Sequence, residues 1–347
     1  MEATLTVDTK GLQQAAEIAE EAVRSGGHPT AVIAVANAEE TLWSHVVPGQ
    51  DNAKIESIFL LASITKPITA TAVMQMVERG RLLLSDPVIK YVPEFGKHGK
   101  EHVTVFHLLT HTSGLAEEWV WQQMQTVSQP SHRELVKAAC ESYLQFEPGT
   151  NYQYCSLSFS ILAEIVSRLT GLRFAEYLSK YVFEPLGMQH TSFAPVDRTL
   201  AMPVHDFGSE EQLEGFIRME VAGGGLWSTA SDMVKFGQAF LRGGQLNGYR
   251  LLSPPAVNTM TRLYTHGMKE VTPEGQRDAA YALGWGKRRN DADLLGSEEM
   301  FMHGGATGTL LAIDPKWQLV FVYLTNRWGV EHDTARKILN AVYGSIT

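Results

Sequence analysis

The feature that most constrains this chain is the placement of its strand-like segments, which lie near both ends of the sequence. Near the N-terminus, residues 28–37 and 41–46 are rich in apolar and β-branched residues, and the short connection between them predicts a hairpin. Residues 57–63 form a third short apolar run. A period of two returns after residue 280, in residues 281–288, 298–304, 309–315 and 318–326. We therefore expect one sheet that collects strands from both ends of the chain.

Helical patterns surround these segments. Apolar residues recur at helical spacing in residues 10–24, and a last helix is expected at about 331–344. The middle of the chain holds further helical patterns at 64–79, 131–144, 156–170, 173–182 and 229–242. This order predicts an α+β fold, an α/β sandwich in which terminal helices pack on an antiparallel sheet and a mostly α-helical region is inserted. We expect a discontinuous sheet domain at 1–62 and 275–347, a mostly helical domain at 63–274, and an active site in the cleft between them.

The charge balance and the cysteine count exclude several classes of protein. The 347 residues include 29 Lys+Arg and 38 Asp+Glu, a net charge of −9, which argues against nucleic acid or an anionic membrane as a partner. Two cysteines are too few for a disulfide framework or a four-cysteine zinc site. The sequence shows no run of about 18 uncharged apolar residues. It also begins without a secretory leader, so the expected location is the cytoplasm.

The segment Ser63-Ile64-Thr65-Lys66 has the pattern S-x-x-K, at the point where an apolar run ends and a helical pattern begins. Residues three apart on a first helical turn share a face, so Lys66 can approach Ser63. A lysine in an apolar pocket is partly neutral and can take the proton of a serine hydroxyl, which activates the oxygen as a nucleophile. Taken alone, the motif is better explained as a helix cap followed by a solvated lysine.

A second segment, Tyr154-Cys155-Ser156, follows a turn at 147–150 and opens another helical pattern. A tyrosine here could share or relay a proton. The serine could hydrogen-bond Lys66 or the substrate. Taken alone, this segment is again better explained as a helix start with a half-buried tyrosine.

A third segment, His303-Gly304-Gly305-Ala306, joins two predicted strands. Its glycines would let a substrate lie against the strand edge. The N–H of Ala306 could then donate to an oxyanion, beside the N–H of Ser63. The alternative is an ordinary hairpin turn.

Together and in this order, the three motifs resemble those of the serine β-lactamase and penicillin-recognising superfamily. The resemblance is to the branch near class C β-lactamases, which includes β-lactamase-like esterases and D-aminopeptidases. That family combines S-x-x-K with Y-x-N or Y-x-S, and with K-T-G or a variant such as H-x-G. The resemblance covers nearly the whole chain, through LLTHTSGL (108–115), FEPGTNYQYCS (146–156), FEPLGM (183–188), AGGGLWSTASDM (222–233) and HGGATGT (303–309).

The resemblance implies a serine hydrolase without metal or cofactor, in which Ser63 is acylated and Lys66 accepts its proton. Tyr154 would be a partner base or the acid that protonates the leaving group, and the family resemblance leaves this choice open. The N–H groups of Ser63 and Ala306 would hold the oxyanion. Further substrate contacts are implied for Ser156, His303, Gly304 and Gly305.

Two residues depart from the usual family pattern. Ser156 stands where many members have asparagine, and a hydroxyl donates one hydrogen instead of two. His303 stands where β-lactamases and transpeptidases usually have lysine, a fixed cation that helps to bind the substrate carboxylate. A histidine is mostly neutral at pH 7, which disfavours an efficient β-lactamase or transpeptidase.

We therefore expect a carboxylesterase whose substrate is a small-molecule ester. The first alternative is a D-aminopeptidase or D-amino-acid amidase that acts on an amide or peptide, and weak β-lactamase or D,D-peptidase activity is compatible with either expectation. A second alternative is a non-catalytic acyl-binding sensor on the same fold. The intact set of Ser63, Lys66 and Tyr154 argues against the sensor, because a scaffold has no need of all three.

Other candidate sites are weaker. Four histidines, His98, His102, His107 and His111, form two pairs at the i, i+4 spacing of zinc ligands, but no H-E-x-x-H motif accompanies them. Cys155 is a less expected nucleophile than a buried, inert cysteine. The G-x-S-x-G motif of α/β-hydrolases is absent.

Two further segments have expected places near the site. Trp119 and Trp121 would form an apolar wall for an acyl or aryl group, with core packing as an equal alternative. The run Gly223-Gly224-Gly225 lacks the lysine of a phosphate-binding loop, so we expect a tight backbone crossing near the site.

Overall fold

A six-stranded antiparallel sheet, in the order β2-β1-β12-β11-β10-β9, organises the part of the chain that the structure describes, residues 5–272, 275–288 and 293–347. This computed structural model confirms that the sheet takes strands from both ends of the sequence, because β1 pairs with β12 and Val35 lies opposite Phe321. The strands are β1 (Ala31–Ala36), β2 (Thr41–Val47), β9 (Gly286–Lys287), β10 (Phe301–Gly304), β11 (Leu310–Asp314) and β12 (Leu319–Leu324).

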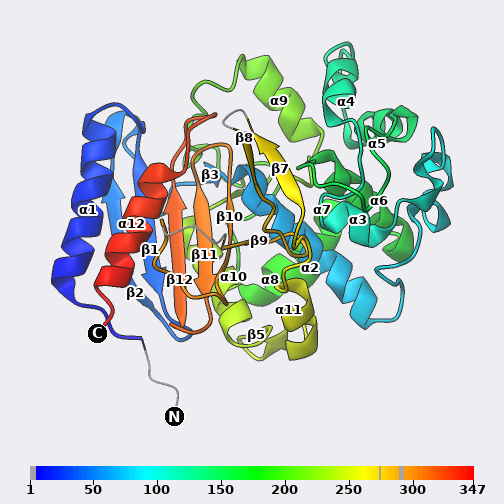
Figure 1. The fold of residues 1–347 in the computed structure, drawn as a ribbon. Helices are drawn as coiled ribbons and strands as arrows, with labels where there is room; N and C mark the ends of the chain where they lie inside the picture. Colours follow the sequence, from blue (N-terminus) through cyan, green and yellow to red (C-terminus); the bar gives the residue numbers. More distant parts are fainter. Residues whose placement is uncertain (1–4, 273–274, 289–292) are drawn as a thin grey trace.

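The two faces of the sheet are covered by different helices (Figure 1). Side chains alternate along each strand, so that Phe321 packs with the terminal helices while its neighbour Val320 packs with the helical region. The terminal helices α1 (Thr9–Arg24) and α12 (Asp333–Gly344) lie side by side on one face. Helix α10 (Ala230–Leu241) packs against the other face, so the predicted α+β sandwich is confirmed.

Helix α2 (Thr65–Glu78) runs through the centre of the helical region. Its residues from Thr65 to Met76 are all buried, and apart from Lys66 and Gln75 they have small or apolar side chains. Its main helical neighbour is α6 (Leu157–Thr170). The other α-helices among the described residues are α3 (Val105–Leu109), α4 (Glu117–Met124), α5 (His132–Glu141), α7 (Phe174–Leu178), α8 (Glu184–Leu186), α9 (Glu210–Arg218) and α11 (Pro254–Met260).

Some predicted elements differ from those observed. The apolar run at 57–63 gives only the short strand β3 (Phe59–Leu60), which pairs with β4 (Trp227–Ser228) outside the large sheet. The helix expected at 173–182 is divided, because α7 ends at Leu178 and a π-helical turn follows. Two short hairpins are additional, formed by β5 (Gln245–Leu246) with β6 (Tyr249–Arg250) and by β7 (Lys269–Thr272) with β8 (Gly275–Asp278).

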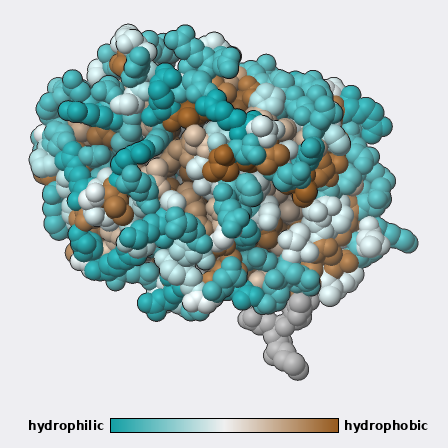
Figure 2. Space-filling model, turned by 180° about the vertical axis from the view of Figure 1, so that it is seen from behind, coloured by the Kyte–Doolittle hydropathy of each residue, from teal (hydrophilic) through white to brown (hydrophobic). Residues whose placement is uncertain are grey.

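The face of the molecule that is seen from behind is mostly hydrophilic (Figure 2). Seen from behind, hydrophobic residues gather in patches toward the middle of the face, between hydrophilic areas (Figure 2). Within the described ranges, no helix combines the length and the apolar character needed to cross a bilayer. The division into a sheet domain and a helical domain with the boundaries given above stays a prediction.

Candidate active site

Ser63 lies in a single 3-10 turn between a short strand and a long helix. Strand β3 ends before it, the turn covers Ala62–Ile64, and α2 begins at Thr65. The backbone of Ala62 has a φ of +47°, a left-handed conformation that is strained for a residue with a Cβ. The hydroxyl of Thr65 donates to the Ala62 carbonyl at 2.7 Å, which ties the turn to the helix. This sharp change of direction leaves Ser63 on the wall of a cavity.

Lys66 is fully buried behind Ser63. Its Nζ lies 3.0 Å from Ser63 Oγ, 3.0 Å from Ser156 Oγ and 2.6 Å from the Gly223 carbonyl oxygen. Burial lowers the pKa of Lys66 from 10.5 to about 7, against an opposing effect of the Glu117 carboxylate. About half of the lysines are therefore neutral near pH 7 and able to accept a proton.

The ring of Tyr154 faces the same ammonium group, with its centroid 4.5 Å from Lys66 Nζ. Burial raises the pKa of Tyr154 well above its usual value, although a hydrogen bond with Ser63 opposes this effect. The phenol therefore keeps its proton at neutral pH. The ring of His111 packs on that of Tyr154 with centroids 4.3 Å apart, and its Nδ1 accepts a hydrogen bond from the Cys155 N–H at 3.0 Å.

At Gly223 the backbone passes directly beside the backbone of Ser156. A Cβ at this glycine would lie 2.4 Å from the Ser156 carbonyl oxygen, so no larger residue fits without a shift of the backbone. The close approach lets the Gly223 carbonyl reach Lys66. The tight backbone crossing predicted for the glycine run is confirmed.

The turn between β10 and β11 is fastened to the strand that leads into Ser63. The hydroxyl of Thr307 donates to the Leu60 carbonyl at 2.8 Å, and that of Thr309 donates to the Leu61 carbonyl at 2.9 Å. Ala306, at the centre of this turn, lines the same cavity as Ser63. Within the described part of the chain, the Ala306 N–H has no hydrogen-bond acceptor. The oxyanion role of this N–H stays a prediction.

His303 and the two glycines after it lie behind this turn and do not line the cavity. The Nδ1 of His303 lies 2.8 Å from the Gly304 carbonyl, which can only accept, so Nδ1 carries the hydrogen. Burial lowers the pKa of His303 to about 3. The ring is therefore neutral, and its Nε2 accepts from the Tyr281 hydroxyl at 2.8 Å. Gly305 packs against the Ser63 turn, where a Cβ would lie 2.2 Å from the Leu61 carbonyl oxygen.

The cavity beside Ser63 has a volume of about 460 Å³. Trp121 lines it, but Trp119 does not, because its ring packs against Tyr143 with centroids 6.4 Å apart. The lining also contains Glu117, at the start of α4, which the sequence analysis did not identify. The remaining lining residues are Ala62, Tyr154, Ser156, Phe207, Phe216, Val221, Gly223, Gly224, Ala306 and Trp328.

Three of these side chains form an aromatic wall, which we define as Phe207, Phe216 and Trp328. Their ring centroids lie 5.3 Å apart for Phe207 and Phe216, 4.7 Å for Phe207 and Trp328, and 6.2 Å for Phe216 and Trp328. The rings come from three separate segments of the chain. Each ring supports the other two, so the wall has a defined shape.

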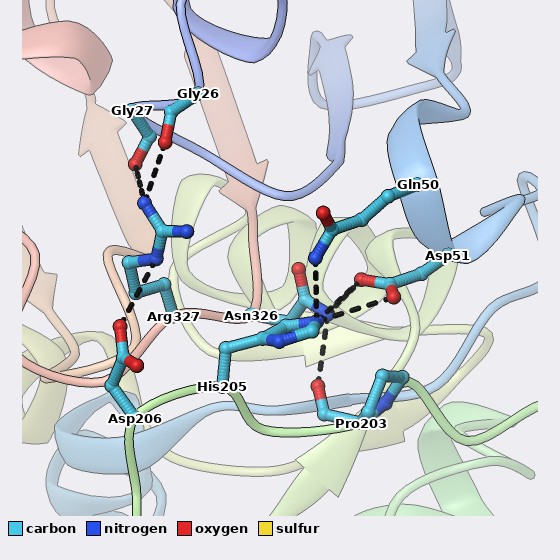
Figure 3. A network of polar contacts seen from close by, with 9 residues as sticks. All are labelled: Gly26, Gly27, Gln50, Asp51, Pro203, His205, Asp206, Asn326 and Arg327. Carbon is cyan, nitrogen blue, oxygen red and sulfur yellow. Dashed lines mark hydrogen bonds and ion pairs between the residues drawn. The ribbon is translucent and has the colours of Figure 1, made fainter.

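A polar network holds the two loop segments that carry Phe207 and Trp328 (Figure 3). The Nε2 of His205 lies 2.9 Å from Asp51 Oδ2, and the side-chain amide of Asn326 donates to the same oxygen at 2.7 Å. The backbones are also joined, because His205 N–H donates to the Asn326 carbonyl at 2.9 Å and Trp328 N–H donates to the His205 carbonyl at 2.8 Å. This network therefore fixes the aromatic wall relative to the end of β12.

The histidines that were considered as zinc ligands do not form a metal site in the described part of the chain. His107 Nδ1 caps its own helix by accepting from the Thr104 N–H at 3.2 Å, and His111 is occupied by Cys155. No group of three or more His, Cys, Asp or Glu side chains with suitable geometry occurs among the residues described. Burial raises the pKa of Cys155 far above its usual value, so its thiol stays protonated.

Comparison with known proteins agrees with this geometry. The family model described as Beta-lactamase matches residues 15–344. Protein Rv1367c of Mycobacterium tuberculosis is 29% identical over 320 residues, which cover 78% of this chain and 77% of the relative. The chain is also similar to the solved structure of EstCE1, a hydrolase with promiscuous acyltransferase activity. The TM-score is 0.82 at 20% sequence identity, and the match covers 96% of this chain and 99% of that chain. For a family VIII carboxylesterase the TM-score is 0.78, with 20% identity and coverage of 99% and 100%. This chain therefore belongs to the beta-lactamase family of serine hydrolases.

Proposed function

We propose that the protein is a carboxylesterase that hydrolyses small esters through an acyl-enzyme at Ser63. The observation that carries the proposal is the cavity into which Ser63 opens. Its described lining is largely apolar and aromatic and contains no lysine, arginine or histidine. A β-lactam or a D-alanyl peptide would bring a carboxylate that finds no cationic partner there. The similarity to a carboxylesterase structure supports the same choice.

Lys66 is the proposed base of the first step. Its Nζ is within hydrogen-bond distance of Ser63 Oγ, and its lowered pKa makes a neutral amine available near pH 7. Burial raises the pKa of Tyr154, so we assign it the relay of protons and not the role of base. As Ser63 Oγ bonds to the ester carbonyl carbon, the hydroxyl proton passes to Lys66. The carbonyl oxygen becomes the oxyanion, which the N–H groups of Ser63 and Ala306 would stabilise.

The leaving alcohol departs when its C–O bond breaks and its oxygen takes a proton from Lys66, directly or through Tyr154. Water then attacks the acyl carbon and gives a proton to Lys66. The Ser63 ester bond breaks and the serine oxygen takes this proton back. Ser156 keeps Lys66 in place during both steps, because its hydroxyl lies 3.0 Å from the lysine Nζ.

The test is steady-state hydrolysis of a short-chain p-nitrophenyl ester by wild type and Ser63→Ala, with a chelator present. Loss of the nucleophile should lower kcat by at least about 10³-fold. Ser25→Ala, at an exposed serine after α1, serves as the matched control and should retain full activity. A Ser63→Ala rate within tenfold of wild type would refute the assignment. Absence of turnover by wild type would instead favour D-aminoacyl amides, and a stable mass adduct at Ser63 would favour the acyl sensor.

A further inference from the structure

Glu117 is the one charged side chain among the described residues that line the cavity beside Ser63. Two donors fix its carboxylate. Its Oε2 accepts from the Ser156 N–H at 2.7 Å, and its Oε1 accepts from the Trp121 indole N–H at 3.0 Å. A carboxylate offers about four acceptor positions, so these two hydrogen bonds orient the group without saturating it.

The aromatic wall lines the same cavity as this carboxylate, together with Trp121. The faces of tryptophan and phenylalanine rings attract cations, and cages of such rings recognise quaternary ammonium groups. An anionic group close to the rings adds a direct electrostatic attraction. The cavity thus combines the two features that favour an organic cation.

Two basic groups lie near the cavity, and neither of them lines it. Lys66 is fully buried, and its Nζ contacts Ser63, Ser156 and Gly223. Arg218 lines a neighbouring groove of about 710 Å³ and is not part of the cavity lining. The net charge of −9 also attracts cations to the protein as a whole.

We propose that this cavity binds an ammonium group, so that the preferred substrates are esters carrying an organic cation. This inference rests on the proposed esterase function. Glu117 is then a residue that determines specificity. It attracts a cationic ester and repels an anionic one, while the reaction itself proceeds through Ser63 and Lys66.

The first test compares three p-nitrophenyl esters of similar length: the neutral pentanoate, the cationic 4-(trimethylammonio)butanoate and the anionic hemiglutarate. Wild type should show the highest kcat/KM for the cationic ester and the lowest for the anionic one. In Glu117→Gln, the ratio of cationic to neutral kcat/KM should fall about tenfold, because a charge-assisted contact is replaced by a neutral one. Glu118→Gln removes the adjacent exposed carboxylate of the same helix and should leave the ratio unchanged.

Two outcomes would overturn the inference. A proportional loss for all three esters would make Glu117 a participant in the reaction, for example as a base for water. An unchanged ratio would show that its charge is not sensed by the substrate. Phe216→Leu provides a second variant that leaves the carboxylate intact, and it should also lower the preference for the cationic ester.

A binding experiment separates this inference from the esterase proposal. Benzyltrimethylammonium, added to the Ser63→Ala protein, should quench tryptophan fluorescence, since Trp121 and Trp328 line the cavity. The additional Glu117→Gln change should weaken this binding about tenfold. Equal binding in both proteins would refute the cation site even if neutral esters are hydrolysed. Conversely, cation binding without ester turnover would refute the esterase proposal alone.

Discussion

The pH dependence of catalysis is the prediction that follows most directly from the burial of Lys66. With a pKa of about 7 in the folded protein, the neutral amine makes up about 10% of the enzyme at pH 6, about half at pH 7 and about 90% at pH 8. For a neutral ester, kcat/KM should therefore rise about fivefold from pH 6 to 7, about tenfold per pH unit below pH 6, and level off above pH 8. An ordinary lysine with a pKa of 10.5 would still be almost wholly protonated at pH 8.

The assay is initial-rate hydrolysis of the pentanoate ester from pH 5 to 9, read at the wavelength where nitrophenol and nitrophenolate absorb equally. The titration of free enzyme appears in kcat/KM, so the midpoint reports the base before the substrate binds. A midpoint above pH 9 would refute the assignment of Lys66 as a buried, half-neutral base. A flat profile between pH 6 and 8 would have the same consequence.

The lowered pKa of Lys66 also makes the stability of the folded protein depend on pH. Between pH 7 and 10.5 the unfolded chain binds more protons at Lys66 than the folded chain, so this residue makes folding more favourable as the pH rises. The fall from 10.5 to about 7 corresponds to about 5 kcal/mol, all of it unfavourable to folding below pH 7. Urea unfolding of Lys66→Met should show an advantage over wild type that shrinks by several kcal/mol from pH 6.5 to 9.5. Parallel pH profiles for the two proteins would contradict this account.

Two further substitutions test the supports of the site. Gly305→Ala places a Cβ 2.2 Å from a backbone carbonyl oxygen, so it should lower the free energy of unfolding by about 1–3 kcal/mol and also lower kcat. The control Gly344→Ala has open space around its Cβ and should be neutral or slightly stabilising. A urea titration measures both changes in stability. Asp51→Asn weakens the network beneath the aromatic wall and should cost about 1–3 kcal/mol and raise KM. The control Asp206→Asn removes a carboxylate whose side chain is 68% exposed, and it should change the free energy of unfolding by less than about 1 kcal/mol. Equal effects of Asp51→Asn and Asp206→Asn would show that Asp51 does not support the aromatic wall.

The core of the site was predictable because its geometry is local. Ser63 and Lys66 are three residues apart, and the first turn of any helix brings such residues together. Glu117 was not predictable in the same way, because it reaches Ser156, 39 positions away, only through the packing of α4. Nothing in the composition of its segment distinguishes it from the exposed Glu118 next to it.

The two tryptophans of α4 show that a sequence pattern does not determine which way each side chain points. Trp119 and Trp121 are two positions apart on a helix, so they point to nearly opposite sides. One lines the cavity and the other packs on Tyr143. The sequence indicates that an aromatic residue is near the site, but the rotation of the helix decides which one.

For the fold, long apolar segments were predicted well and short polar ones were not. The strands β11 and β12 are buried on both faces and have a clear pattern. The hairpin of β7 and β8 has no alternation of apolar and polar residues, because β8 is exposed along its whole length. Its pairing rests on backbone hydrogen bonds and on two cross-strand ion pairs, Lys269 with Asp278 and Arg277 with Glu270.

The sheet that joins both ends of the chain also has a consequence for synthesis. All six residues of β1 are buried in the finished protein, yet β12, which covers one of its edges, is translated after nearly the whole chain. At about 5–20 residues per second, β1 waits roughly 15–60 s on the ribosome for this partner. During that time an apolar strand edge is open to pairing with other chains. We therefore expect the nascent chain to need chaperone protection until its last strands emerge, and its yield in cells to depend on translation speed more than its final stability would suggest.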